Sequence, residues 1–519
     1  MSNTIYTAIA FAPIQEFIEK SCKLRDLYGS SFIVSYLACA VCEAAKKQGF
    51  HVVFPAIINV AQGTPNQIII RGAFQQKDAS AAFKKAWKTL TRTCQQWIEK
   101  HVQGKAQWRQ EWELWTNHAW EFFWTQGESI SQAWCKLDNI KRQRNWVGIN
   151  WQGESSMLSG ADAIAYLGMG SHRNPTHRNL AVEAEEIRSF YKQLNQLENA
   201  FVDENEELSI PELIKRLITF DVVAQQLNLK PHQLPSVEIP ESFCNLNPLA
   251  NKCWTGWFQG NGDKIVRFLT TVSNHQNEED ILNQFSQRML NWGKNDLKPS
   301  VEKSLGRIIY AGGDNFLGVF YRNPPGKLIA EKCLRWFYSF PRVWRKHEYA
   351  EDITASIGFV WAAPRVPQQD ILRHCREAEK SAKDKGRDRI ALRILFNSGN
   401  WLEWVCPWWF LQDVLESYDD RNYGQNWTHI YNDVAILESR HAFDGNQSQV
   451  ALALFEIYFG SANRGTLEKH LWDVHGKTGI LGNRQQDLKK LHLNLNEWII
   501  SLAKVGFHLA NNRPSTVSC

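Results

Sequence analysis

The residues best suited to chemistry lie in a short turn, Gly312-Gly313-Asp314-Asn315. It separates two apolar runs within residues 307–321, and its residues favour the positive φ angles of a tight hairpin. Carboxylate and amide oxygens are also ligands that hard divalent cations accept. A role in forming the turn remains an alternative for Asp314, because Asp side chains hydrogen-bond the backbone of such hairpins.

A cationic loop and the Cys are two further groups of residues that could bind RNA or zinc. The loop 172–178 concentrates cations, so Arg173 and Arg178 are candidate contacts to an RNA backbone, with an ordinary solvated loop as the alternative. The eleven Cys are irregularly spaced, whereas structural zinc prefers four ligands in close pairs. We therefore predict no zinc site, and buried apolar roles for most of the Cys.

The pattern at the start of the chain predicts a small α/β unit. Residues 4–12 read as a buried strand that ends at Pro13, followed by a short helix with Ile14 on its apolar face. A helix at 32–45, a strand at 51–57 and a β-rich run at 67–71 come next. This pattern predicts a ferredoxin-like domain over residues 1–77.

Residues 78–249 change to a polar, helical pattern that we interpret as a helical insertion. Ten of the 23 Trp lie between Trp87 and Trp151, interleaved with charged residues. This spacing favours amphipathic helices whose Trp pack inward, with stacking on RNA bases as the alternative.

A second α/β unit is predicted over residues 250–401, and a C-terminal helical domain over 402–519. The overall class is therefore α+β, with two ferredoxin-like domains. The elements expected in the second unit are strand 253–258, helix 280–292, the hairpin in 307–321, helix 327–337, strand 354–361, a helix between Pro367 and Gly386, and strand 389–396.

Several of these segments resemble a known family, the Cmr-type large subunit of type III CRISPR effector complexes. The turn in residues 306–315 is similar to the family's strand–GGDD–strand palm motif, here with the sequence GGDN. The blocks cover well under half of the chain, and the helical regions add only a compatible size and class. The other similar blocks are residues 12–18, 23–32, 354–358, 378–383 and 386–389.

The resemblance implies that two palm units bind ATP with Mg²⁺ or Mn²⁺ and make cyclic oligoadenylates. Asn315 stands where the family has a second Asp, and Asn261-Gly262-Asp263 matches an Asp-Gly-Asp pattern without its first carboxylate. Asp314 and Asp263 are then the catalytic and metal-binding candidates, with Asn261 and Asn315 as weaker ligands. We expect weak metal and ATP binding and weak or absent catalysis.

The same resemblance suggests nucleotide contacts. They are Ser30 and Ser31 in the first palm, Gly312, Gly313 and Asn315 in the hairpin, and Lys383 and Arg387 beside the second palm. The two cations meet phosphates in this hypothesis. Alternatively, they are solvated charges near the C-terminus of a helix.

Many relatives also carry an N-terminal HD nuclease domain. Here Met1–Thr4 precede the first predicted strand and no His is followed by Asp. We therefore expect no HD nuclease in this polypeptide, so that a separate subunit would supply DNA cleavage.

Composition predicts how the protein contacts RNA and in which compartment it acts. The 519 residues carry 59 Lys and Arg against 54 Asp and Glu, a net charge of +5, so RNA contacts must be local. No leader sequence, no apolar run of membrane-spanning length and an odd number of Cys are expected of a soluble, cytoplasmic protein without membrane contacts.

Three hypotheses follow. The first is an architectural subunit that binds guide crRNA and target RNA beside backbone, guide-end-capping and small subunits of a type III complex. The second is a target-RNA-activated ATP cyclase, and the third is a stand-alone palm-type nucleotide-binding protein. Product formation separates the first two, and copurifying subunits with a small RNA exclude the third.

Overall fold

The chain folds into two compact units, each described below by itself. Residues 1–243 and 269–290 form the first unit, and residues 244–268 and 291–519 form the second. The computed structural model describes residues 4–60, 62–104, 108, 111–143, 153–169, 177–197, 202–203, 206–227, 253–265, 268, 271, 277–302, 305–321, 328, 330–347, 353–420, 427–444, 447–472, 478–482 and 488–511.

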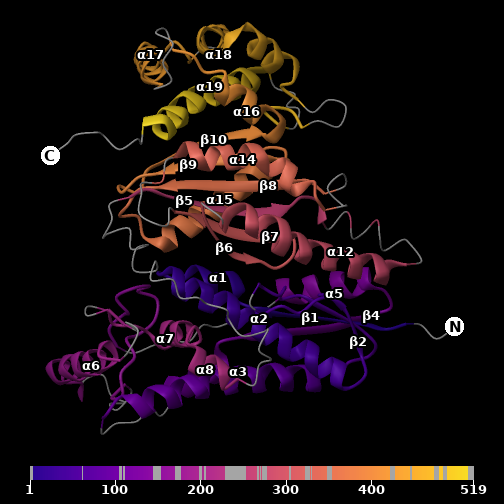
Figure 1. Cartoon of the computed structure of the whole chain (residues 1–519), viewed down its shortest axis with the longest axis vertical. Helices are drawn as coiled ribbons and strands as arrows, with labels where there is room; N and C mark the ends of the chain where they lie inside the picture. Colours follow the sequence, from indigo (N-terminus) through magenta and orange to yellow (C-terminus); the bar gives the residue numbers. More distant parts are fainter. Residues whose placement is uncertain are drawn as a thin grey trace. The chain divides into compact units, whose positions relative to one another are not determined.

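The first unit contains an antiparallel four-stranded sheet in the order β2-β3-β1-β4. Figure 1 labels β1, β2 and β4. Ala8 to Phe11 of the central strand are buried, which is why this strand reads as a continuous apolar run. The strands are β1 Tyr6–Ala12, β2 His51–Phe54, β3 Ile68–Arg71 and β4 Glu121–Gly127. The last strand lies inside the range 78–249, so the first sheet draws on residues beyond 77.

Helices cover both faces of this sheet. Ile9 and Phe11 face a core shared with α2, α3 and α7, whereas Ala8 and Ala10 pack with α5 and Leu282 of α12. This division follows from the two-residue repeat of a strand. The helices are α1 Ile14–Glu19, α2 Leu24–Lys47, α3 Gln76–His101, α4 Glu111–His118, α5 Ile130–Arg142, α6 Leu180–Asn195, α7 Ile210–Leu217, α8 Asp221–Gln225 and α12 Glu278–Trp292.

The Trp-rich segment packs inward where the structure describes it. Trp87, Trp108 and Trp112 are buried in the larger core, and others, such as Trp120 and Trp124, lie against it. The indole N–H of Trp112 donates to the carbonyl of Thr91 at 3.0 Å. The packing interpretation therefore accounts for these Trp; Trp146 and Trp151 lie outside the described residues.

Helix α2 is more apolar than we expected of any segment of this chain. By length and composition α2 is apolar enough to cross a membrane, contrary to the prediction that no such run exists. In its most apolar 18-residue window, 72% is buried within the fold. Such burial is what a core helix of a folded domain shows, and α2 packs against α3 and α7.

The second unit is built on a six-stranded sheet in the order β10-β9-β8-β5-β7-β6. Only β8 and β9 pair in parallel, and α15 (Gln368–Asp384) connects them. Both strands are buried along their whole length, as expected for strands covered on two faces. The strands are β5 Thr255–Gly262, β6 Gly306–Ala311, β7 Asn315–Phe320, β8 Ala355–Ala362, β9 Arg389–Leu395 and β10 Trp401–Pro407.

The C-terminal helices follow the edge strand β10, and Figure 1 shows them on that side of the sheet. The strand itself lies almost wholly within residues 402–519, which were expected to be helical. The elements before and after it are the π-helix Gly293–Leu297, α13 Lys298–Glu302, α14 Ala330–Trp344, α16 Trp408–Glu416, α17 Thr428–Ser439, α18 Gln449–Lys469 and α19 Leu488–Asn511. The predicted α+β class is confirmed by this mixture of sheets and helices.

Candidate functional site

The predicted GGDN hairpin is present in the second unit. It joins the antiparallel strands β6 and β7, and Gly313 adopts φ 135°, a conformation that side chains rarely tolerate. The carbonyl of Asp314 accepts a hydrogen bond from the N–H of Gly262 at 3.1 Å. The turn is therefore tied to the end of β5, where the Asn-Gly-Asp segment lies.

Asn261 and Asn315, the two predicted weaker ligands, lie directly opposite each other. Asn261 of β5 pairs in register with Asn315 of β7, and its amide nitrogen donates to the Asn315 side-chain oxygen. The ammonium of Lys383 donates to Asn261 Oδ1 at 2.8 Å and also pairs with Glu379 at 2.6 Å. An amide pair and a lysine thus occupy the place expected to hold acidic ligands.

Asp263 is fully buried and its carboxylate is satisfied within the chain. The hydroxyl of Ser356 donates to its two oxygens at 2.8 and 3.0 Å, and the hydroxyl of Thr354 donates at 2.9 Å. The backbone N–H of Asp388 adds a further bond of 3.0 Å. These contacts make Asp263 an anchor between β5, β8 and the turn that precedes β9.

That turn has an unusual backbone. Arg387 and Asp388 both have positive φ angles, 64° and 52°, as does Lys264 next to Asp263 at 59°. Such conformations cost on the order of 1 kcal/mol or more for residues other than Gly and gather at functional sites. Burial, followed by the charge of Asp263, raises the pKa of Asp388 to about 6.

Burial raises the pKa of two other carboxyls near the hairpin. For Asp314 the desolvation outweighs the opposing effect of its own backbone N–H and of Lys383. For Glu379 burial also prevails, although the ion pair with Lys383 favours the charged form. The pKa of Asp388 is raised as well, so three carboxyls of this region hold protons more tightly than free ones.

These residues do not fit a divalent-metal site of the palm type. Mg²⁺ and Mn²⁺ need several charged or carbonyl oxygens directed at one point. Asp263 is engaged by three donor groups, Asn261 accepts from Lys383, and Asp314 interacts with its own backbone N–H. Within the described ranges, no three His, Cys, Asp or Glu side chains gather as metal ligands do.

The remaining predicted contacts are distributed over both units. In the second unit Lys383 lies at the site and the exposed Arg387 lies in the turn after α15. In the first unit Ser30 is buried, where its hydroxyl contacts Ser21 Oγ and donates to the Asp26 carbonyl, both at 2.8 Å; Ser31 is half-buried. Their roles in nucleotide binding stay predictions.

The predicted RNA contacts are only partly described. Arg178 makes two hydrogen bonds to the carboxylate of Glu183, at 2.8 and 2.5 Å, and so carries a neutralised charge. Arg173 lies outside the described residues.

Sequence reasoning missed four residues that shape the site. Thr354, Ser356, Glu379 and Asp388 all contact its predicted members. A signal for the first two was available, because Thr354 and Ser356 are two apart on a strand and so share a face. Both residues lie in the block 354–358 that resembles the family, and hydroxyls at these positions can donate to a carboxylate.

Cysteine is buried at six described positions, in agreement with the apolar role predicted for most of these residues. They are Cys39, Cys42, Cys94, Cys333, Cys375 and Cys406. Burial raises the pKa of the Cys42, Cys94, Cys333 and Cys375 thiols well above the ordinary value. Neutral thiols are poor metal ligands and poor nucleophiles. Cys244 lies outside the described residues.

Comparison with known families identifies both units. Residues 255–391 match the model of the Cas10/Cmr2 second palm domain. Residues 6–113 match the model of the N-terminal region of the CRISPR-associated protein Cmr2. The site above therefore lies in the matched palm. Among curated proteins, none matches the sequence.

Solved structures share this fold at low sequence identity. A chain of the type III-B Cmr-beta complex in its apo state aligns with TM-score 0.56 and 11% identity, over 98% of this chain and 82% of that chain. A chain of the Csm1–Csm4 cassette in complex with cA3 aligns with TM-score 0.50 and 12% identity, over 98% and 69%. At such identities the likeness concerns the fold.

Proposed function

Because the chain belongs to the Cas10/Cmr2 family of large subunits of type III CRISPR complexes, we propose that it acts mainly as an architectural subunit with an impaired cyclase site. In this role it binds guide crRNA and target RNA in the cytoplasm, beside the backbone, guide-end-capping and small subunits. DNA cleavage is left to another subunit.

The observation that carries the proposal is the replacement of acidic ligands by an amide pair and a lysine. Asn261 and Asn315 hydrogen-bond each other, and Lys383 donates to Asn261. A palm transfers nucleotidyl groups through metal ions that neutralise the triphosphate. With an ammonium on one ligand and Asp263 held by hydroxyls, binding of a metal–ATP complex is weak and catalysis is impaired.

A second function, target-RNA-activated synthesis of cyclic oligoadenylates, rests on the retained Asp314. Its carboxylate is the acidic group of the hairpin, and its position in the turn matches the family motif. A third possibility, a stand-alone nucleotide-binding palm protein, has less support because the matched families and structures come from type III complexes.

The deciding experiment uses the whole purified complex with labelled ATP, Mn²⁺ and matching target RNA. We expect guide and target RNA to copurify and bind, with no cyclic oligoadenylate formed by the complex. An Asp314→Ala complex serves as the matched control. Cyclic products that disappear in this variant would replace the architectural proposal by the cyclase, and a chain that purifies without subunits or RNA would favour the third possibility.

A further inference from the structure

Trp401 begins the edge strand β10 of the second unit and is 48% exposed, although Trp is highly buried on average. Its ring lies over the guanidinium of Arg393, whose central carbon is 4.2 Å from the ring centre. The two are diagonal neighbours on one face of the sheet, because Trp401 pairs with Leu395 and Arg393 pairs with Glu403. Since Arg393 covers one face of the ring, much of the exposed area belongs to the opposite face.

A hydrogen-bond donor without an acceptor stands beside this ring. His374 of α15 lies 6.3 Å from Trp401 between ring centres, at a tilt of 59°, and its side chain is 6% exposed. Its Nδ1 lies 2.7 Å from Arg393 Nη1; because a guanidinium only donates, Nδ1 accepts and Nε2 carries the hydrogen. Burial, followed by the charge of Arg393, lowers the pKa of His374 and so favours the neutral ring. Among the described residues the Nε2–H has no acceptor, and this nitrogen is not sealed from solvent.

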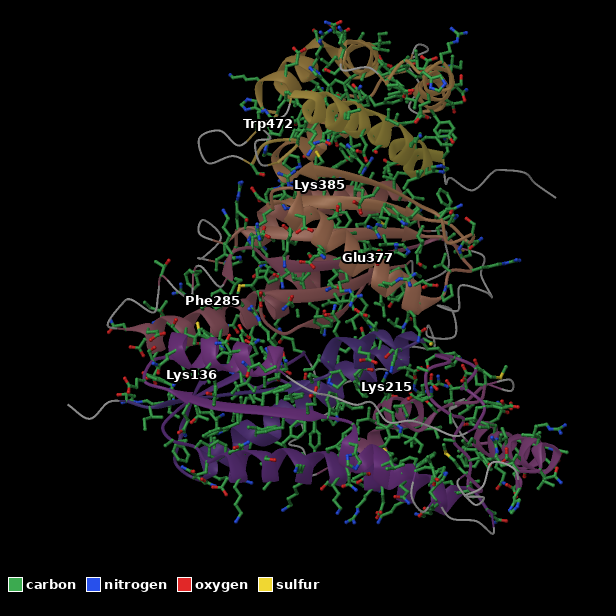
Figure 2. All side chains as sticks on the ribbon, turned by 180° about the vertical axis from the view of Figure 1, so that it is seen from behind. Lys136, Lys215, Phe285, Glu377, Lys385 and Trp472 are labelled. Carbon is green, nitrogen blue, oxygen red and sulfur yellow. The ribbon has the colours of Figure 1, made fainter. Side chains whose placement is uncertain are left out.

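An acceptor lies next to this donor. Glu377, which Figure 2 labels, is 45% exposed, and its Oε2 is 3.6 Å from His374 Nδ1. Arg393 donates to Glu377 at 2.9 Å and to Glu403 at 2.6 Å, so one guanidinium serves two carboxylates. The open face of the ring is thus bordered by one group that donates and one that accepts.

An exposed cation lies at the same end of the sheet. Arg365 follows β8, and its backbone N–H donates to Asn397 Oδ1 at 3.0 Å, in the turn that leads to Trp401. The Ala363 N–H donates to the carbonyl of Leu395, the partner of Trp401, so the two segments are neighbours. No acceptor for the Arg365 guanidinium is found within the described ranges. Arg365 therefore adds a positive charge that is available to an anionic group.

We propose that Trp401 stacks an unpaired RNA base whose edge meets His374 and Glu377, while the adjoining phosphate meets Arg365. A base stacks on any aromatic face, and its edge carries both donors and acceptors. A Phe side chain of a partner protein supplies a ring but neither the edge groups nor the negative charge.

This surface is separate from the hairpin site. Trp401 is level with Thr255, at the start of β5, because Leu395 pairs with Ala362 and Ala362 pairs with Thr255. The hairpin lies at the other end of β5, where Asn261 pairs with Asn315. The inference rests on the proposed RNA-binding function and names one of its contacts, whether or not the cyclase is active.

The test is a fluorescence titration of the full chain with single-stranded octa-adenylate that carries one 2-aminopurine, a base analogue whose emission falls when it stacks. The competitor is an octamer with abasic ribose at every position, which keeps the phosphates but has no rings. We expect unlabelled octa-adenylate to compete at least about tenfold better than the abasic octamer, because stacking contributes most of the affinity for single strands.

Variants locate the contact. Trp401→Leu should weaken octa-adenylate binding about tenfold, whereas Trp401→Phe, which keeps a ring, should weaken it about threefold or less. Arg365→Gln should lower the slope of log affinity against log salt by about one phosphate contact. Arg335→Gln is the matched control, because this exposed guanidinium pairs with Glu331 on α14, and it should leave binding unchanged. Circular dichroism melts show whether Trp401→Leu still folds, and Arg365→Gln tests the site without altering the ring.

Several outcomes would overturn the inference. They are equal competition by the abasic octamer, octa-adenylate binding that is absent, and binding that Trp401→Leu leaves unchanged. Oxidative footprinting of Trp401 in the purified complex tests for a protein occupant, because protection that persists after ribonuclease treatment would assign this face to a partner subunit. If guide RNA copurifies with the wild-type complex, these results remove the inference alone. A complex that contains no RNA would contradict the proposed function and the inference together.

Discussion

Asp26 in the first unit and Asp263 in the second are fully buried carboxylates that are satisfied in opposite ways. In the first unit Arg216 of α7 donates twice to Asp26 of α2, at 3.0 Å each, and once to Glu206 at 2.5 Å, and Lys23 also pairs with Glu206. In the second unit the described partners of Asp263 are hydroxyls and a backbone N–H. One cluster balances its charges, and the other satisfies a carboxylate with neutral donors.

This difference separates a structural cluster from a candidate site. Balanced charges leave little electric field outside the cluster, so the first group serves to join α2 and α7. Neutral donors bring no opposite charge to Asp263, and the Coulombic effect of Asp263 contributes, after burial, to the raised pKa of Asp388. The second unit therefore has a buried carboxylate beside the hairpin that acts on a neighbouring carboxyl.

The largest expected effect comes from a variant that breaks the buried cluster around Arg216 in the first unit. Arg216→Met removes the cation that serves both Asp26 and Glu206 and leaves two buried carboxylates without it. We expect the first unit to lose about 4 kcal/mol of unfolding free energy. Urea titration measures this loss, with the transition of each unit fitted separately.

Arg464→Met is the matched control for that variant. Its guanidinium pairs with Glu456 and Glu468 at the surface, so we expect a much smaller loss of unfolding free energy than for Arg216→Met. Equal costs for the two Arg variants would show that the buried cluster does not hold the first unit together.

The next effect concerns the anchor of the second unit. Asp263→Ala leaves the hydroxyls of Thr354 and Ser356 and the N–H of Asp388 without their acceptor, at an expected cost of about 2–3 kcal/mol. Hydrogen exchange followed by mass spectrometry should show faster exchange in residues 386–389. If exchange there is unchanged while global stability falls, Asp263 does not anchor the turn.

A smaller effect depends on pH. The pKa of Asp388 is about 6 in the folded chain against 3.8 ordinarily, so the folded state binds the proton more tightly. Its stabilising contribution is complete below about pH 4 and is lost as pH rises through 6. After allowance for solvent screening we expect a loss of about 1 kcal/mol, measured as the difference between wild type and Asp388→Asn across this range.

The comparison of wild type with Asp388→Asn also removes the contribution of His347, which changes stability with pH in the opposite direction. Burial lowers the pKa of His347 to about 4, so that group lends stability that is lost as pH falls. His347 is present in both chains and cancels. A difference that does not change with pH would contradict the raised pKa of Asp388.

The smallest effect tests the amide pair itself. Asn315 is exposed, so Asn315→Ala should change the unfolding free energy by no more than about 0.5 kcal/mol, even though it removes the contact with Asn261. Thermal melts of the wild type and of this variant measure the change. A loss as large as that of Asp263→Ala would mean that the amide pair, and not only Asp263, holds the sheet end together.

The sequence by itself determined the α+β class, most elements of both sheets and the position of the GGDN hairpin. These features depend on local signals, such as the apolar run at residues 6–12 and the Gly-Gly pair at the turn, which act over a few residues. Strand β4 was missed because Glu121–Gly127 lies within a polar, helical pattern, and β10 because Trp401–Pro407 lies at the start of a region with a helical pattern.

Only the tertiary structure decided which of the predicted side chains are free for chemistry. Asn261 and Asp263 are engaged by residues that lie 54 to 125 positions away in the chain. Ser30 was predicted to contact nucleotide but is buried against Ser21. Hydrogen bonds and burial depend on which surfaces meet in space, and a residue's type and its neighbours in the chain carry no record of that.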